Sequence, residues 1–207
     1  MSGLIKNEFF TMRRVILLYA GVLLVYQLLG VYGTQMAGVQ IFSVFFCTML
    51  VISSFSYGEK SGWNVYVNVL PVSRGQIVLC KYLFALICMA VAAAFGLLVQ
   101  CILNGRNGIP VFQDAWVTGA AVITAGLFLS VVLPVLFKVG AEKSRVILVL
   151  LFLIPFAAVL IMEKTGVRIS LSPERLLSLL PAVGLGTAAV VLLSCVVSME
   201  IYKRKEF

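Results

Sequence analysis

The side chains best suited to chemistry or recognition lie in one stretch, residues 57–81, where charged and aromatic residues interleave. Trp63, Tyr66 and Leu70 follow the i, i+3, i+7 spacing of one helix face, although the valines and asparagines between them equally permit an extended segment. Pro71 ends this element in either case. Aromatic side chains are enriched at protein interfaces, so the stretch is suited to gripping a soluble partner. The alternative is that Trp63 and Tyr66 anchor the chain at the level of lipid headgroups.

The sequence lacks the residue sets of the common catalytic centres. It has no histidine, which excludes a histidine base, a histidine metal ligand and a Ser-His pair. The five cysteines never form a C-x-x-C pair and lie within or at the edges of apolar runs, so we interpret them as packing residues. Residues 138–145 superficially resemble a phosphate-binding loop, but the G-x-x-x-x-G-K-[ST] spacing is absent. Neither a metal site nor ATP hydrolysis by this chain is expected.

Composition indicates the kind of element that must position the 57–81 stretch. The chain has 207 residues, of which 62% are hydrophobic and 12% charged, and its mean hydropathy is +1.11. Soluble domains carry about 25% charged residues. A soluble enzyme, a secreted disulfide scaffold and a disordered chain are therefore excluded. We predict a single all-α, multi-pass membrane domain over residues 1–207.

Six apolar runs have about the length needed to cross a bilayer, and in hydrocarbon only a helix satisfies its own backbone. No ionisable residue lies near the middle of a run, which argues against a proton relay or an ion-coupled carrier. Pro181, Gly184 and Gly186 predict a kinked or re-entrant start to the last run. The predicted spans are Val15–Gly33, Val39–Ser56, Ile77–Leu103, Trp116–Phe137, Val146–Met162 and Leu176–Met199.

The first fourteen residues predict a short amphipathic helix. Its apolar residues Ile5, Phe9, Met12 and Ile16 recur at i, i+4, i+7 and i+11, with the basic residues elsewhere. Such a helix is suited to lying in the membrane interface. A plain helical extension of the first span fits the same pattern.

Two capping signals predict where helices begin. Ser73 and Gln76 fit a capping box before the third apolar run, in which each side chain bonds the other residue's amide. Ser172 followed by Pro173 fits an N-cap with proline at the first helical position.

The distribution of basic residues predicts the orientation. The net charge is +8, and basic residues flank the apolar runs, where they meet anionic headgroups rather than nucleic acid. With the N-terminus inside, twelve of the 16 Lys and Arg residues fall on the inner side. The positive-inside rule therefore predicts that both termini are cytoplasmic. The outer side holds Arg106, Lys164, Arg168 and Arg175.

Several short motifs lie in the predicted inner segments of the chain. Residues 59–63 read EKSGW, residues 70–78 read LPVSRGQIV, and Lys81-Tyr82 follows at the start of the third apolar run. Residues 137–145 read FKVGAEKSR, and residues 201–207 form a basic tail. In their order and spacing these motifs resemble the E-K-x-x-W, L-P-[VI]-S-R and K-Y signatures of the small six-span permeases of ABC type-2 transporters, and the last two look like further signatures of that family.

The resemblance implies the permease subunit of an ATP-driven exporter, with both termini at the inner face of a bacterial-type cell membrane. Such a permease pairs with a cytoplasmic ATPase, which holds the ATP and magnesium, and with a second permease copy or a related one. The cargo stays open. The residues expected to couple to the ATPase are Glu59, Lys60, Trp63, Tyr66, Leu70, Pro71, Ser73 and Arg74, with Lys138, Gly140, Glu142, Lys143 and Arg145 of a second inner loop as secondary candidates.

Two other classes of function fit a chain of this kind. A substrate-capture subunit of a vitamin or metal uptake transporter also uses about six spans in a chain of this size. A membrane enzyme is disfavoured by the missing histidine and the lack of a paired-carboxylate motif. Tight vitamin binding without an ATPase favours the capture subunit, whereas co-purification with a cytoplasmic ATPase favours the permease.

Overall fold

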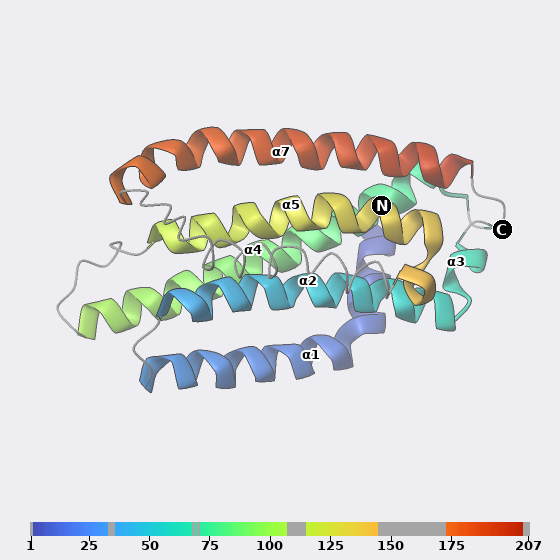
Figure 1. Ribbon diagram of the computed structural model, residues 1–207. Helices are drawn as coiled ribbons and strands as arrows, with labels where there is room; N and C mark the ends of the chain where they lie inside the picture. Colours follow the sequence, from blue (N-terminus) through green and yellow to red (C-terminus); the bar gives the residue numbers. More distant parts are fainter. Residues whose placement is uncertain are drawn as a thin grey trace.

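The computed structural model describes residues 2–32, 36–67, 69, 71–106, 115–144 and 173–204, and within these ranges the secondary structure is helical with no strand. The predicted all-α class is confirmed for this part of the chain. The helices, with the labels of Figure 1, are α1 (Ser2–Tyr32), α2 (Met36–Lys60), α3 (Trp63–Tyr66), α4 (Arg74–Arg106), α5 (Ala115–Val139) and α7 (Pro173–Lys203).

Three of these helices are long and apolar enough to cross a membrane, by length and composition, within the described residues. They comprise Arg74–Ile102 of α4, Trp116–Val139 of α5 and Leu180–Lys203 of α7. Their outer faces carry large apolar side chains; Leu98 is 62% exposed and Leu192 is 69% exposed. Such surfaces are costly in water and favourable against lipid, so the outside of the bundle is suited to a bilayer.

The remaining predicted spans compare with the helices as follows. The first and second predicted spans fall within α1 and α2, apart from Gly33. The fifth, 146–162, lies outside the described residues, as does the predicted cap Ser172. Pro173 is the first residue of α7, as expected for a proline at the first helical position.

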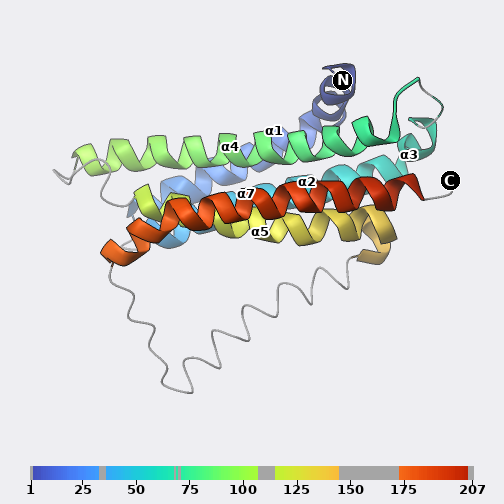
Figure 2. The ribbon, with the colours of Figure 1, turned by 90° about the horizontal axis from the view of Figure 1, so that it is seen from above.

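The long helices run side by side with roughly aligned axes (Figures 1 and 2). The ends of α2, α5 and α7 meet at one end of the bundle, together with α3 and the start of α4 (Figure 1). We call this the loop end, defined by residues 57–74 and 138–144. The start of α1 lies toward the same end in Figure 1. Residues 57–74 and 138–144, which are far apart in the sequence, are therefore neighbours at the loop end.

The N-terminal segment is helical and continuous with the first predicted span, so it is an extension of that span rather than a separate helix. Figures 1 and 2 show its first turns angled away from the rest of α1. The predicted apolar face packs against protein: Met12 is fully buried, and the Phe9 and Phe84 rings meet edge to face with centroids 5.2 Å apart. This contact holds α1 against α4.

Helices α5 and α7 approach each other closely through small residues. A Cβ on Gly126 would lie 3.0 Å from the Thr187 methyl, and one on Gly119 would lie 3.3 Å from Leu180 Cδ2. Gly184 faces Ile123 of α5, as expected for a packing residue, whereas Gly186 faces open space. The predicted irregular start of the last span is not an unwound one, because α7 is helical through Pro181.

A buried hydroxyl network links the three span helices. The Tyr82 hydroxyl of α4 lies 2.7 Å from Ser194 Oγ and 2.8 Å from Ser198 Oγ of α7. Ser194 Oγ in turn donates to the Ser130 carbonyl of α5 at 2.6 Å. Every hydroxyl in the network has a partner, which is how polar groups are tolerated inside an apolar bundle.

Candidate functional site

The segment after α2 forms a tight helical turn that presents two aromatic rings at the loop end. Gly62 has φ of +67°, a left-handed conformation that suits glycine and lets the chain reverse after α2. The Tyr66 amide donates to the Gly62 carbonyl at 3.2 Å, and the Val67 amide to the Trp63 carbonyl at 2.8 Å. The helical alternative is therefore correct for Trp63–Tyr66, the four residues of α3, whereas Leu70 lies outside the described residues. The Trp63 and Tyr66 rings lie 5.6 Å apart, centroid to centroid.

The predicted capping box at the start of α4 is confirmed. The Gln76 amide donates to Ser73 Oγ at 3.3 Å, and the Ser73 amide donates to Gln76 Oε1 at 3.2 Å. These bonds satisfy amides that a helix start otherwise leaves without a partner. The hydroxyl of Ser73 thus serves the fold, and exposed Pro71 leads the chain into the cap.

Glu59 joins the two predicted inner loops. Its carboxylate accepts a hydrogen bond from the Ala141 amide at 2.7 Å and one from the Glu142 amide at 3.3 Å. Glycine is needed at position 140 for two reasons. Its φ of +88° is a left-handed conformation that suits glycine, and a Cβ there would lie only 2.6 Å from Glu59 Oε1. Charge-assisted bonds of this kind are stronger than neutral ones. The end of α2 is therefore tied to the residues that directly follow α5.

Arg74 makes a second long-range tie at the loop end. Its guanidinium Nη1 donates to the Lys203 carbonyl at 2.6 Å, which satisfies a carbonyl at the end of α7. The positive charge also suits the negative end of the α7 helix dipole. The first turn of α4 is therefore bonded to the last turn of α7.

The rings of Phe55, Phe137 and Tyr202 extend these contacts into the bundle. The Phe55 and Phe137 rings meet edge to face with centroids 4.9 Å apart, and Phe137 meets Tyr202 at 5.5 Å. The three residues come from α2, α5 and α7. Edge-to-face aromatic contacts add stability beyond the area they bury, so the three helix ends form one packed unit.

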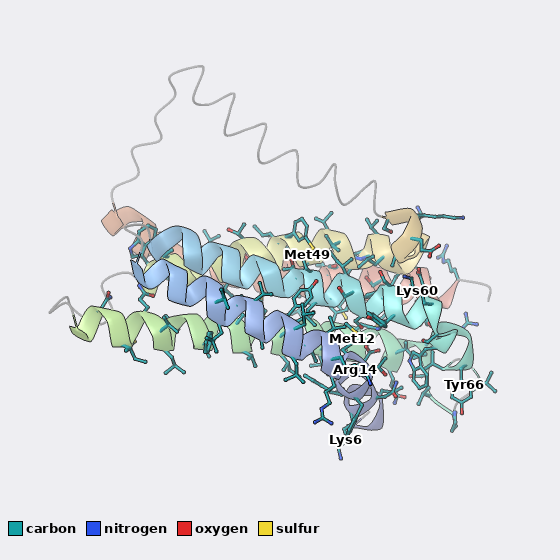
Figure 3. All side chains as sticks on the ribbon, turned by 90° about the horizontal axis from the view of Figure 1, so that it is seen from below. Lys6, Met12, Arg14, Met49, Lys60 and Tyr66 are labelled. Atoms are coloured by element: carbon teal, nitrogen blue, oxygen red, sulfur yellow. The ribbon has the colours of Figure 1, made fainter. Side chains whose placement is uncertain are left out.

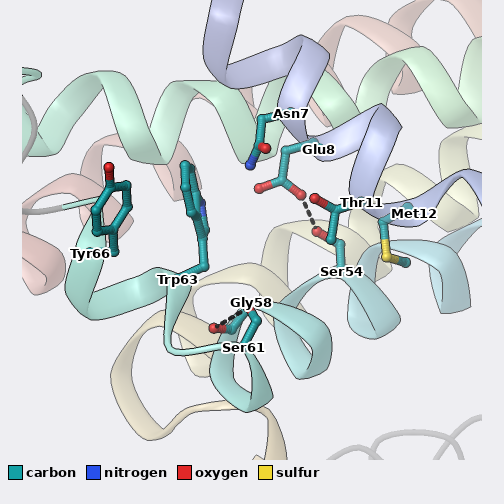
Figure 4. A pocket seen from close by; sticks show the side chains of 9 residues that line it. All are labelled: Asn7, Glu8, Thr11, Met12, Ser54, Gly58, Ser61, Trp63 and Tyr66. Carbon is teal, nitrogen blue, oxygen red and sulfur yellow. Dashed lines mark hydrogen bonds between the residues drawn. The ribbon is translucent and has the colours of Figure 1, made fainter.

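A cavity of about 350 Å³ lies beside the Trp63 turn, between it and the first turns of α1 (Figure 4). Trp63 and Tyr66 stand on one side, and Glu8 and Asn7 reach toward the space from α1 (Figure 4). One wall is thus aromatic and another polar. The lining residues are Asn7, Glu8, Thr11, Met12, Ser54, Gly58, Ser61, Trp63 and Tyr66.

A buried ion pair next to this cavity was missed by the sequence interpretation. Lys81 Nζ lies 2.8 Å from Glu8 Oε1, and the two side chains are only 7% and 9% exposed. Ser54 Oγ lies 2.6 Å from both Glu8 Oε2 and Lys81 Nζ. Lys81 also lies 4.9 Å from the centroid of the Phe55 ring. Glu8 follows Ile5 by three positions and precedes Met12 by four, so its place on the apolar face was the available signal.

The structure separates the expected coupling residues into two groups. In the first group, Glu59 and Gly140 meet between the loops, and Ser73 and Arg74 are engaged with their own chain. Trp63 also belongs to this group, because its ring is half-buried and packs against the core. Leu70 and Arg145 lie outside the described residues. The members of the second group have exposed side chains at the surface of the loop end: Lys60, Tyr66, Pro71, Lys138, Glu142 and Lys143.

Within the described residues, the bundle has an apolar outer surface and a charged loop end. These two features define an integral membrane protein with a surface suited to a soluble partner. Among the described residues, no group of three or more Cys, Asp or Glu side chains could hold a metal ion. The chain belongs to the ABC-2 family transporter proteins, whose family model matches residues 3–203. The resemblance seen in the sequence is confirmed, and the protein is a transporter membrane subunit of the permease type. No curated protein and no solved structure matches the chain.

Proposed function

We propose that this protein is the permease subunit of an ATP-driven exporter whose energy comes from a separate cytoplasmic ATPase. Family membership supports the transporter role. The missing phosphate-binding loop supports a separate source of energy, with ATP and magnesium on the partner. The functional unit contains a second permease copy or a related chain. In this proposal the chain crosses a bacterial-type cell membrane six times, with both termini on the cytoplasmic side, on the strength of the basic residues that flank the apolar runs.

The observation that carries this proposal is the set of ties at the loop end. A permease without its own ATPase needs a cytoplasmic surface that receives movement and helices that respond to it. The Trp63 turn supplies the surface, because Tyr66 is 59% exposed beside it. The bonds from Glu59 to Ala141 and from Arg74 to Lys203 connect that surface to α5 and α7. Movement of the turn therefore reaches the transmembrane helices.

Replacing Trp63 with alanine tests the proposal better than replacing Arg74, whose guanidinium holds α7 within the chain. The chain offers a matched control in its other tryptophan, Trp116, near the opposite end of the bundle at the start of α5. Both variants are purified with the ATPase subunit and reconstituted in lipid nanodiscs, and ATP hydrolysis and permease–ATPase affinity are measured.

We expect Trp63→Ala to weaken assembly by roughly 2 kcal/mol or more, as for an aromatic anchor of an interface, and to lower stimulated hydrolysis with it. Trp116→Ala should leave both unchanged. If Trp63→Ala assembles and hydrolyses ATP like the parent, the turn is a headgroup anchor and the coupling role is refuted. Tight binding of a vitamin by the purified chain, without any ATPase, contradicts the exporter assignment itself.

A further inference from the structure

An apolar groove runs along the membrane-facing side of α1 and α4. It has a volume of about 260 Å³, and its lining is almost entirely apolar. Helix α1 contributes a ridge from Phe9 to Leu24, and α4 contributes Ile87 to Phe95. The nine residues of the α4 wall rise about 12 Å, which is most of the roughly 15 Å depth of one leaflet. The groove therefore has the length to hold most of an acyl chain.

The floor of the groove is made by small or fully packed residues. Ala92 and Cys88 of α4 are 4% and 8% exposed, and Leu50 of α2 closes the space between the helices. Ala20 of α1 is exposed along the groove. These short side chains leave the hollow that larger residues would fill.

A basic residue stands at one mouth of this groove. An adjoining hollow is lined by Arg13 together with Phe9 and Ile16, and the last two also line the groove. Arg13 is exposed. Figure 3 shows Lys6 and Arg14 on the same angled first turns of α1, so the local charge is positive.

The charged residues also locate the mouth at the membrane surface. No charged residue follows Arg14 in α1, and none lies between Lys81 and Arg106 in α4. The contact of Phe9 with Phe84 sets the start of the groove just beyond Lys81. The groove thus begins where charge ends and continues into the hydrocarbon.

We propose that this groove binds one anionic phospholipid, with its phosphate at Arg13 and an acyl chain between α1 and α4. Arg13 recognises the phosphate through the planar guanidinium, which matches phosphate oxygens. The apolar lining places the acyl chain between two helices, where it contacts protein on two sides instead of other lipids. The proposal depends on the membrane location of the chain and not on its role as an exporter.

The test measures which lipids remain on the full-length protein. The protein is reconstituted in nanodiscs with equal phosphatidylglycerol and phosphatidylcholine and extracted into detergent, and the bound lipids are counted by native mass spectrometry. We expect the parent to retain phosphatidylglycerol in preference. Arg13→Gln should lower that retention about fivefold, the effect of one basic residue near an anionic surface. The matched control Arg14→Gln, an adjacent exposed residue, should retain the lipid.

A second pair of variants tests the groove itself. Ala20→Phe puts a ring into the groove and should displace the lipid, whereas Ala90→Phe, an exposed alanine of α4 outside the lining, should not. Equal losses from Arg13→Gln and Arg14→Gln would overturn the proposal in favour of diffuse attraction. Unchanged lipid retention in Ala20→Phe would also overturn the proposal. If that variant keeps its lipid but loses self-association, a second copy of the protein, and not a lipid, covers the groove.

Discussion

Replacing Gly140 with alanine tests the tie between the two loops. The new Cβ would lie 2.6 Å from Glu59 Oε1, so the carboxylate must leave the Ala141 and Glu142 amides. Alanine in the left-handed conformation itself costs about 1–2 kcal/mol. Loss of hydrogen bonds to a charged group costs a further ~1.5–3 kcal/mol.

Gly62 provides a matched control. It has a similar positive φ, +67° against +88° for Gly140, but a Cβ on it would meet nothing within 4 Å. Gly62→Ala therefore carries the conformational cost alone. The difference between the two variants isolates the Glu59 contact.

The assay is thermal unfolding of the purified variants in detergent. For a chain of this size 1 kcal/mol corresponds to about 2–4 °C in Tm, so Gly140→Ala should melt roughly 3–12 °C below Gly62→Ala. In a Glu59→Ala background, alanine at 140 should cost no more than alanine at 62, because the two sites are coupled. Equal Tm values for the two glycine variants, or an undiminished penalty at 140 without Glu59, would refute the reasoning.

Three further predictions follow from the buried ion pair and from the sequence. Glu8→Gln should destabilise the protein by about 3–5 kcal/mol, because the buried charge of Lys81 then lacks its counterpart. The double variant Glu8→Leu with Lys81→Met should recover most of the loss in Tm. A Glu8→Gln variant as stable as the parent would contradict this prediction. Cysteines placed at positions 60 and 143 should react with an impermeant thiol reagent only in opened cells; labelling from outside intact cells would reverse the predicted orientation. The purified chain should hydrolyse no ATP, and robust hydrolysis free of contaminating ATPase would disprove the reliance on a partner.

Several features of this protein follow from the sequence because their causes are local. A helix start depends on residues three positions apart, so Ser73 and Gln76 predicted the cap that begins α4. The apolar face of α1 depends on the 3.6-residue period, so Phe9 and Met12 were correctly expected on one face. The low charge and the long apolar runs indicated a helical membrane protein, because composition and the length of an apolar run do not depend on how the chain folds. The loop motifs then identified the family.

The partners of the charged side chains were decided only by the tertiary structure. The Glu59 carboxylate finds its amide 82 residues away, and Arg74 finds its carbonyl 129 residues away. Glu59 and Arg74 were expected to face a partner protein, yet both bond within their own chain. Likewise nothing local pairs Glu8 with Lys81. These contacts depend on how the long helices align, because a helix fixes which residues share its face and leaves open which neighbour that face will meet.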